Sequence, residues 1–276
     1  MKDKNLMDKA ETRLSATILL LRDRKDLLEV FMVERHHKID FAEGALVFPG
    51  GKVETSDADP QLVSHCRGAD PDLPDKNTLR VAAIRETFEE CGVLLARPRG
   101  EGRLIDGARL ASIDREHRDA LLSGGRTMLD VVQTEELELA FDLLVPFAHW
   151  ITPEFMPKRF DTHFFLVAAP ADQLAIHDGH ESVDSLWTTT SQAIELEKSG
   201  QRTIIFPTLE NIKKLGRSQS VDQALEDARR DKIVTVLPTI SKEADGTLMM
   251  EIPADAGYET IRSRVSPPPR PNAKNH

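Results

Sequence analysis

TLRVAAIRETFEECGV, residues 78–93, is the stretch that decides the fold of this chain. Its apolar side chains recur at helical spacing, which predicts one helix packed against a core by a single face. The members of that face are Val81, Ile84, Phe88 and Cys91. Gly92 follows as the predicted C-cap, because glycine readily adopts the left-handed backbone that ends many helices.

Three acidic residues lie close together near the end of this predicted helix. The spacing of Glu86, Glu89 and Glu90 places their carboxylates on one helix face. Like charges this close repel one another unless a cation lies among them, and hard carboxylate oxygens favour Mg²⁺ or Mn²⁺. A solvated acidic helix face is the alternative, and the three glutamates alone do not exclude it.

A glycine turn lies upstream of this helix. The apolar residues 45–48 predict a short strand, and Pro49-Gly50-Gly51 ends it in a tight turn. Glycine has no side chain, so the backbone of such a turn can approach a ligand closely. The turn and the acidic helix together favour a binding site over a solvated surface.

The turn and the helix together resemble the Nudix box, Gly-x5-Glu-x7-Arg-Glu-U-x-Glu-Glu-x-Gly-U, where U is bulky and aliphatic. The matching positions are Gly51, Arg85, Glu86, Glu89, Glu90, Gly92 and Val93. Three features depart from the pattern: Asp57 replaces the first glutamate, Thr87 occupies a U position, and 27 residues, 58–84, stand where the pattern has seven. An insertion inside the box is typical of one branch, the peroxisomal-type acyl-coenzyme A diphosphatases and their bacterial relatives.

Two further segments resemble the same branch. They are Trp150-Ile151-Thr152-Pro153 with KRFDTHFFLV at 158–167, and Phe206-Pro207-Thr208-Leu209. The resemblance implies an α/β Nudix fold over residues 12–262, with a mixed sheet between helices and insertions at about 58–77 and 97–142. Residues 1–11 are expected to form a tail, and the Pro-rich residues 263–276 are predicted to be disordered.

The resemblance also implies roles in a metal site. Glu86 and Glu90 are the expected ligands, then Glu89 and the backbone carbonyl of Gly51. Arg85 would orient the glutamates through an ion pair. Asp57 stands where the box glutamate meets that arginine, and its shorter side chain leaves open whether it reaches.

The general base is left open between the box glutamates Glu89 and Glu90 and a glutamate outside the box. The candidate outside the box is Glu181, with Asp184 second, and a solvent-exposed acid at a strand edge is the alternative role for both.

Basic residues are candidates for contacting substrate phosphates. Arg35 begins the basic stretch 35–38, for which a solvated loop is the alternative. Lys158 and Arg159 precede a predicted buried strand, where a salt bridge between Arg159 and Asp161 is the alternative.

The function that the resemblance implies is hydrolysis of a nucleoside diphosphate linked to another group. Its branch indicates coenzyme A or acyl-coenzyme A, giving 3′,5′-ADP and (acyl) phosphopantetheine. An ADP-ribose or NADH pyrophosphatase is one rival. A Nudix-fold binding module without catalysis is another, although the intact box glutamates argue against it.

Composition narrows the partners and the compartment. The 276 residues carry a net charge of −10, which argues against a general binder of nucleic acid or anionic membranes. No apolar run approaches the roughly 18 residues of a membrane span, and the N-terminus is too polar for a signal peptide. Two cysteines do not suggest a disulfide framework. We therefore expect a cytoplasmic protein that acts on a small-molecule nucleotide.

The remaining elements follow from local pattern. Predicted strands are 15–21, 27–34, 143–151 and 164–168, with a charged turn at 22–25 and a terminal hairpin of 233–240 and 247–252. Predicted helices are 59–63, 108–122, 128–139, 191–200, 206–215 and 221–230. The first insertion is either a flap over the site or a surface elaboration, with Pro71 and Pro74 as helix breakers. The helical pair of the second would serve substrate choice or dimerisation, which leaves a homodimer open.

Overall fold

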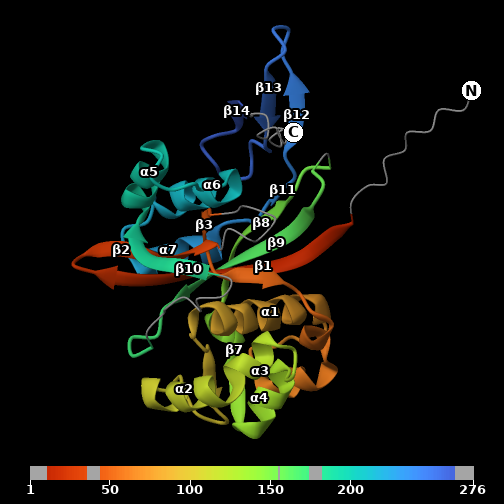
Figure 1. The fold of residues 1–276 in the computed structure, drawn as a ribbon, viewed down its shortest axis with the longest axis vertical. Coiled ribbons are helices and arrows are strands. Elements are labelled where there is room, and N and C mark those ends of the chain that lie inside the picture. The colour runs from red at the N-terminus through yellow and green to blue at the C-terminus, as the bar shows by residue number, and fades with distance from the viewer. Residues whose placement is uncertain (1–10, 36–43, 155, 174–181, 265–276) are drawn as a thin grey trace, which may run out of the picture.

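The computed structural model describes residues 11–35, 44–154, 156–173 and 182–264. In these residues a mixed sheet separates two groups of helices (Figure 1). Helices α1 to α4 lie on one side of the sheet, and α5 to α7 lie on the other. The α/β class with a sheet between helices, which the sequence predicts, is therefore confirmed. No helix in this part of the chain is both long and apolar enough to cross a membrane.

The main sheet has the order β10-β2-β1-β9-β8-β11, with β3 beside β2 and β4 beside β1. The β1–β9 and β8–β11 pairs are parallel, and the other pairs are antiparallel. Its strands are β1 Thr12–Arg24, β2 Leu27–Arg35, β3 Leu46–Val47, β4 Gly50–Lys52, β8 Val145–Ile151, β9 Arg159–Ala168, β10 Ser182–Thr189 and β11 Thr235–Val236.

Strand β1 lies between the two hydrophobic cores. Its side chains alternate between the faces of the sheet, as in any strand. Ile18 and Leu20 belong to the core that α1 covers, and Leu19 and Leu21 belong to the core that α5 to α7 cover. Burial on both faces explains why this strand is a continuous apolar run in the sequence.

The predicted hairpin of β1 and β2 is confirmed, although its turn lies further along the chain than expected. Lys25 and Asp26 both have positive φ, 51° and 61°. Two consecutive positive φ values match the type I′ turn, whose twist suits a two-residue hairpin. The paired strands therefore continue through Arg24 instead of ending before the charged residues.

Helix α1, Pro74–Cys91, begins four residues before the predicted start. We expected Pro74 to break a helix, but it occupies the first turn, where no backbone N–H is required from it. The predicted C-cap is confirmed, because Gly92 has φ 64° and ψ 24°. Its backbone N–H donates to the carbonyl of Phe88.

The two insertions pack together on the side of α1 that faces away from the main sheet (Figure 1). Their strands form a second sheet in the order β5-β7-β6. The elements are η1 Thr55–Ala58, η2 Pro60–His65, β5 Cys66–Arg67, β6 Ala96–Pro98, α2 Gly107–Ile113, a π-helical segment Asp114–Arg118, α3 Asp119–Leu122, α4 Met128–Thr134, β7 Leu137–Ala140 and η4 Phe141–Leu143.

The first insertion is part of this packed layer. Asp59 caps the short helix η2 by accepting from the backbone N–H of Gln61, as the Asp-Pro pair predicts. Leu62 is buried in the core under α1, and β5 pairs with β7 from the second insertion. Residues 59–67 are therefore part of the packed layer beneath α1.

The prediction of one helix over residues 128–139 is wrong at its C-terminal end. Helix α4 begins with a capping box between Thr127 and Asp130 and ends at Thr134. Glu136 then has φ 51°, which reverses the chain into β7. Burial of Leu137 and Leu139 on one strand face overrides the helical pattern.

The C-terminal elements are α5 Thr190–Lys198, α6 Phe206–Leu215, α7 Val221–Arg230, β12 Thr239–Lys242, β13 Leu248–Glu251 and β14 Arg262–Arg264. Thr189 caps α5, which begins one residue before the predicted helix 191–200. The predicted strand 233–240 is divided: β11 joins the main sheet and β12 begins the terminal hairpin. β14 includes two residues that we expected in the tail, whereas residues 265–276 lie outside the described residues.

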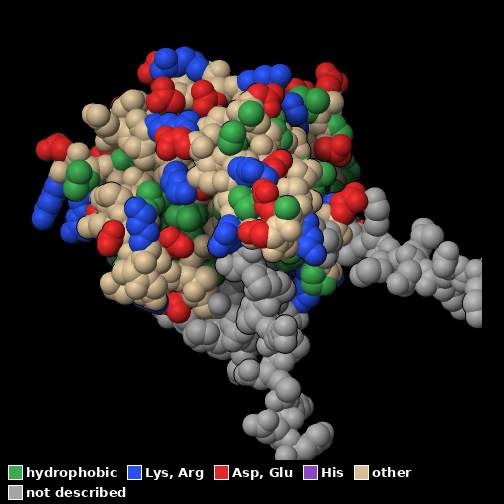
Figure 2. Space-filling view, turned by 90° about the horizontal axis from the view of Figure 1, so that it is seen from above, with side chains coloured by type: hydrophobic (Ala, Val, Ile, Leu, Met, Phe, Trp, Pro, Cys, Tyr) green, Lys and Arg blue, Asp and Glu red, His purple; other side chains and the backbone are tan. Residues whose placement is uncertain are grey.

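Charges of both signs are mixed on the surface. On the face shown in Figure 2, Lys and Arg side chains alternate with Asp and Glu side chains instead of gathering by sign. This mixture fits the negative net charge of the chain and offers no single-sign field on that face.

Candidate active site

The glycine turn and α1 meet at the edge of β1. Strand β4 pairs with β1 so that Gly51 lies beside Ala16. A Cβ atom at Gly51 would lie only 2.4 Å from the carboxylate of Glu86. A Cβ atom at Gly50 would lie 2.4 Å from the carbonyl oxygen of Ala16. Both positions therefore need glycine, one for the approach of the helix and one for the approach of the strand.

A hydrogen bond ties this turn to a second glutamate of the helix. The backbone N–H of Gly50 donates to Oε2 of Glu90, at 3.0 Å. Glu90 is buried, with 6% of its surface exposed. The turn thus contacts Glu86 with one glycine and Glu90 with the other, which fixes both carboxylates against β4.

Arg85 joins the remaining carboxylates into one network. Its Nε and Nη2 donate to the two carboxylate oxygens of Asp57, at 2.8 and 2.9 Å. Its Nη1 donates to Glu86 at 3.0 Å and to Glu89 at 2.9 Å, and Nη2 also donates to the carbonyl of Lys52. The question that the sequence left open is answered, because Asp57 reaches Arg85 in bidentate geometry.

Asp57 reaches because the chain turns immediately after β4. Residues 55–58 form η1, and the backbone N–H of Glu54 donates to Oδ2 of Asp57 at 2.8 Å. The turn brings the shorter carboxylate over Arg85, and the Asp57 side chain has no exposed surface.

The network carries more negative than positive charge. Asp57, Glu86 and Glu89 pair with the single guanidinium of Arg85, and Glu90 accepts from the neighbouring turn. Burial, together with the charges of Glu54 and Asp57, raises the pKa of Glu89 to about 7, although Arg85 opposes this shift. For Arg85, burial alone would lower the pKa, but its hydrogen bond to Asp57 and the surrounding carboxylates raise it.

This arrangement fits a divalent cation. Several hard carboxylate oxygens converge beside a backbone turn that leaves no room for a side chain. The raised pKa of Glu89 indicates that the site favours added positive charge, either a proton or a metal ion. Glu86, Glu89, Glu90 and the Gly51 carbonyl could hold such an ion, whereas Arg85 acts by positioning them.

The second insertion supports the end of the acidic helix. Arg118, in the π-helical segment, donates from Nε to the backbone carbonyl of Glu89 at 2.9 Å. It also pairs with Asp114, at 3.3 Å. A cation at a helix C-terminus satisfies free carbonyls and favours the helix dipole. Residues of the insertion therefore help to hold α1 where the glutamates are carried.

The other candidate residues lie apart from this network or outside the described residues. Glu181 lies outside the described residues, and so does the side chain of Arg35. Asp184 pairs with Arg202, at 2.7 Å. Lys158 is partly buried, and Arg159 is buried and donates to the carbonyl of Thr152.

The alternative role for Arg159, a salt bridge to Asp161, is wrong. Among the described residues, the carboxylate of Asp161 pairs with His149 and His163. Neither histidine was predicted as a site residue. Positions 161 and 163 precede the predicted strand 164–168, whereas β9 begins at Arg159 and includes both. Neither their shared face nor the pairing of β8 with β9 that adds His149 was therefore predicted.

Comparisons with known proteins identify the family of this chain. A family model described as NUDT19 Nudix domain matches residues 58–215. Acyl-coenzyme A diphosphatase NUDT19 of Xenopus laevis is 24% identical over 83% of this chain and 71% of its own length. The human protein of that name is 26% identical over 83% and 72%. A solved NUDIX hydrolase from Alicyclobacillus acidocaldarius is 28% identical, with a TM-score of 0.63, and covers 79% of this chain and 96% of that one.

Proposed function

Because this chain belongs to the Nudix family, through its match to the NUDT19 Nudix domain, we propose that it is a metal-dependent diphosphatase. It hydrolyses a nucleoside diphosphate linked to another group. The observation that carries this proposal is the buried carboxylate network of α1, held against a glycine turn that a single methyl group would disrupt.

We further propose coenzyme A and acyl-coenzyme A as the substrates. The products are then 3′,5′-ADP and (acyl) phosphopantetheine. The support is the name of the vertebrate relatives. The match covers more than two thirds of the length of each of them. The insertion inside the box and the segments at 150–153 and 158–167 support the same branch.

In the proposed mechanism, Glu86 and Glu90 hold the cation, with Glu89 and the Gly51 carbonyl as further ligands. A divalent cation there, Mg²⁺ or Mn²⁺, supplies charge neutralisation at the diphosphate and lowers the pKa of bound water. The chain contributes the positioning: Arg85 holds the carboxylates of Glu86 and Glu89 in place. Burial keeps competing water away from these charges.

The general base is proposed among Glu89, Glu90 and Glu181. Glu89 has a pKa of about 7, which suits a group that takes up a proton near neutral pH. Bound positive charge would lower that pKa and leave the carboxylate ionised. Arg35, Lys158 and Arg159 are proposed to contact substrate phosphates.

The first test is a product assay. The protein is incubated with Mg²⁺ or Mn²⁺ and with coenzyme A, an acyl-coenzyme A, ADP-ribose or NADH, and the products are identified by mass. Appearance of 3′,5′-ADP from the coenzyme A substrates, with little AMP from the others, is the expected result. Dominant AMP would retain the chemistry and overturn the substrate. No cleavage with either metal would make the binding module the better proposal.

The second test removes one expected ligand. Glu90→Gln keeps the size and hydrogen bonding of the side chain but loses its charge, so kcat should fall at least about 100-fold. Glu195→Gln, at an exposed carboxylate of α5, is the matched control and should retain activity. Thermal unfolding of both variants separates loss of chemistry from loss of fold. Wild-type activity in Glu90→Gln would remove Glu90 from the site.

A further inference from the structure

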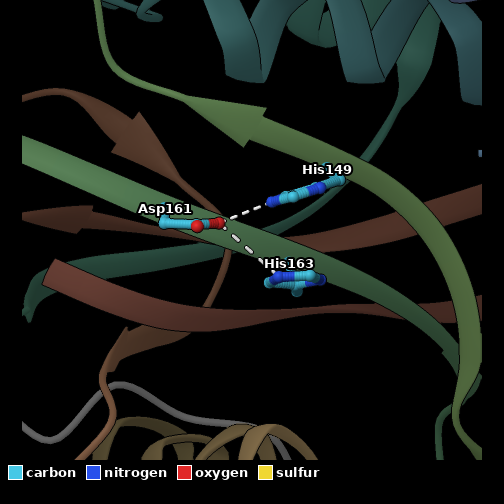
Figure 3. A group of neighbouring side chains, drawn as sticks. All are labelled: His149, Asp161 and His163. Carbon is cyan, nitrogen blue, oxygen red and sulfur yellow. Dashed lines mark hydrogen bonds and ion pairs between the residues drawn. The ribbon is translucent and has the colours of Figure 1, made fainter. Parts of the chain in front are cut away.

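A second group of ligand-type side chains lies on the main sheet. His149 is on β8, and Asp161 and His163 are on β9. His149 and His163 are directly paired across the two strands. Asp161 and His163 are alternate residues of one strand and therefore share a face. Figure 3 shows the three side chains together, with both imidazoles directed towards the carboxylate.

Their ligand atoms converge. Nε2 of His149 lies 2.5 Å from Oδ1 of Asp161, and Nε2 of His163 lies 3.5 Å from the same oxygen. The imidazole rings are stacked, with centroids 3.9 Å apart and planes 19° from parallel. One ligand atom from each residue lies within 4.8 Å of the other two, which is the spacing of donors around a single ion.

Hydrogen bonding prepares these donors for a cation. Nδ1 of His149 lies 2.8 Å from Oγ1 of Thr235, on β11. This contact fixes the orientation of the His149 ring, so that its Nε2 faces the carboxylate of Asp161. Two imidazole nitrogens and one carboxylate oxygen thus converge on one point, where a bound cation would be stabilised.

We propose that His149, Asp161 and His163 form a second metal site, specific for a divalent transition metal, with Zn²⁺ preferred. Two imidazoles and one carboxylate form a ligand set that zinc adopts in proteins and that magnesium avoids. The Thr235 hydroxyl fixes the orientation of one ligand, as partners of metal-bound histidines commonly do. Three protein ligands leave a further position for water or a ligand oxygen.

The site is reachable from solvent. The side chains of His149, Asp161 and His163 are 17%, 29% and 30% exposed. An ion could therefore enter without local unfolding, and a small ligand could reach its open position. A buried ion pair closed to solvent would lack both properties.

The second site is separate from the carboxylates of α1. His163 on β9 pairs with Ala16 on β1, and Ala16 pairs with Gly51 on β4. These residues form one row on the same face of the sheet, two strand spacings across, which is about 10 Å. The two sites are therefore too far apart to share one ion, but both open on the face that carries α1.

A second histidine cluster, around His117, differs from this site because arginines already balance its charge. Nε2 of His117 lies 3.0 Å from Glu135, and Arg126 donates to its Nδ1. Arg109 also pairs with Glu135, at 2.7 Å. Two guanidinium groups already supply positive charge there, and His117 is completely buried. We therefore place the new site only on β8 and β9.

The proposal is tested by measuring metal binding to untagged protein. This protein carries Glu86→Gln and Glu90→Gln, because the two substitutions remove negative charge from the carboxylate site of α1. Zn²⁺ and Co²⁺ are titrated by calorimetry and by competition with a chromophoric chelator. We expect one saturable Zn²⁺ site, a Co²⁺ absorption spectrum typical of nitrogen ligands, and no displacement by Mg²⁺. Absence of saturable Zn²⁺ binding would overturn the proposal.

Single substitutions then identify the ligands. In the same background, His163→Gln and, separately, His149→Gln should weaken Zn²⁺ binding at least about 100-fold, and Thr235→Val should weaken it about 10-fold. Circular dichroism confirms that each variant is folded, and two histidine variants guard against misfolding of one. Unchanged Zn²⁺ affinity in a folded histidine variant would overturn the proposal and leave a proton as the charge between these groups.

Discussion

The two clusters on the α1 side of the sheet differ in how their charges are balanced. At α1, three carboxylates pair with one guanidinium and a fourth, that of Glu90, is bonded to the glycine turn, so the site needs a further cation. On β8 and β9, one carboxylate faces two imidazoles, and a single shared proton or metal ion is enough. The first arrangement suits a hard ion bound by oxygen, and the second suits a softer ion bound by nitrogen.

The clusters also differ in how they are built. The glutamates lie within one turn of a single helix, so their spacing is set locally. The histidines are brought together by strand pairing between residues 14 positions apart. A local cluster tolerates movement of the helix as a unit, whereas a cluster across strands depends on the register of the sheet. Substitutions in the two clusters should therefore have different effects on stability and on metal binding.

The largest effect is expected from removing the buried partner of Arg85. Asp57→Ala leaves a buried guanidinium without its bidentate carboxylate, so the free energy of unfolding should fall by about 3–5 kcal/mol. Urea denaturation measures the change. Asp227→Ala removes the partner of the exposed Arg230 and should cost less than about 1 kcal/mol. Equal losses in the two variants would show that burial does not strengthen the Arg85 pair.

The next effect is a pH dependence at Glu89 in the metal-free protein. Its pKa is about 7 in the folded chain and about 4.5 when unfolded, so between these values the native state holds the extra proton. Stability from this group therefore falls as pH rises from 4.5 to 7. Relative to Glu89→Gln, the wild type should lose about 2 kcal/mol between pH 5 and pH 8.

Mg²⁺ is the control for this experiment. A bound cation favours ionised Glu89, so saturating Mg²⁺ should remove the loss. A difference between wild type and Glu89→Gln that stays constant with pH in metal-free protein would contradict the raised pKa.

A smaller effect is expected from adding one methyl group at the turn. In Gly51→Ala the new Cβ meets the end of the Glu86 side chain at 2.4 Å, and that flexible carboxylate must move. Mg²⁺ affinity and kcat should each fall about 10-fold, with little change in stability. Gly102→Ala is the control, because a Cβ there meets nothing within 4 Å. Full activity in Gly51→Ala would show that Glu86 does not need this contact.

These contrasts explain how much could be predicted from the sequence. The helix, its cap Gly92 and the shared face of Glu86, Glu89 and Glu90 follow from spacing within one segment. The contact between Asp57 and Arg85 depends on the path of η1, which local pattern does not determine. The pairing of His149 with His163 depends on strand register, which residues on either strand alone do not reveal.

The end of α4 shows a related limit. Helical spacing continues through residues 135–139 in the sequence. In the structure, however, β7 is the central strand of the short sheet and pairs with both β5 and β6. Pairing satisfied the backbone of β7 on both sides and buried Leu137 and Leu139. Tertiary contacts therefore decided a segment whose local pattern favoured helix.

The smallest effect contrasts the second cluster with the first by the sign of its pH dependence. The folded pKa of His163 is about 4 and the unfolded value is 6.5, so the unfolded chain binds the extra proton between them. Stability from this group is therefore lost as pH falls from 6.5 towards 4, opposite to Glu89. Metal-free wild type should lose about 1 kcal/mol more than His163→Gln between pH 7 and pH 4.5, because partial exposure reduces the effect.

Denaturation at the two pH values measures this loss, and Zn²⁺ sharpens the contrast. At pH 7 Zn²⁺ should stabilise the wild type and leave His163→Gln unchanged, since only the wild type retains both imidazoles. Protons and Zn²⁺ compete for the same nitrogen atoms, so Zn²⁺ stabilisation should weaken as pH falls. An identical pH profile in the two proteins would mean that the fold does not lower the pKa of His163, and burial would then shift a pKa in the first cluster only.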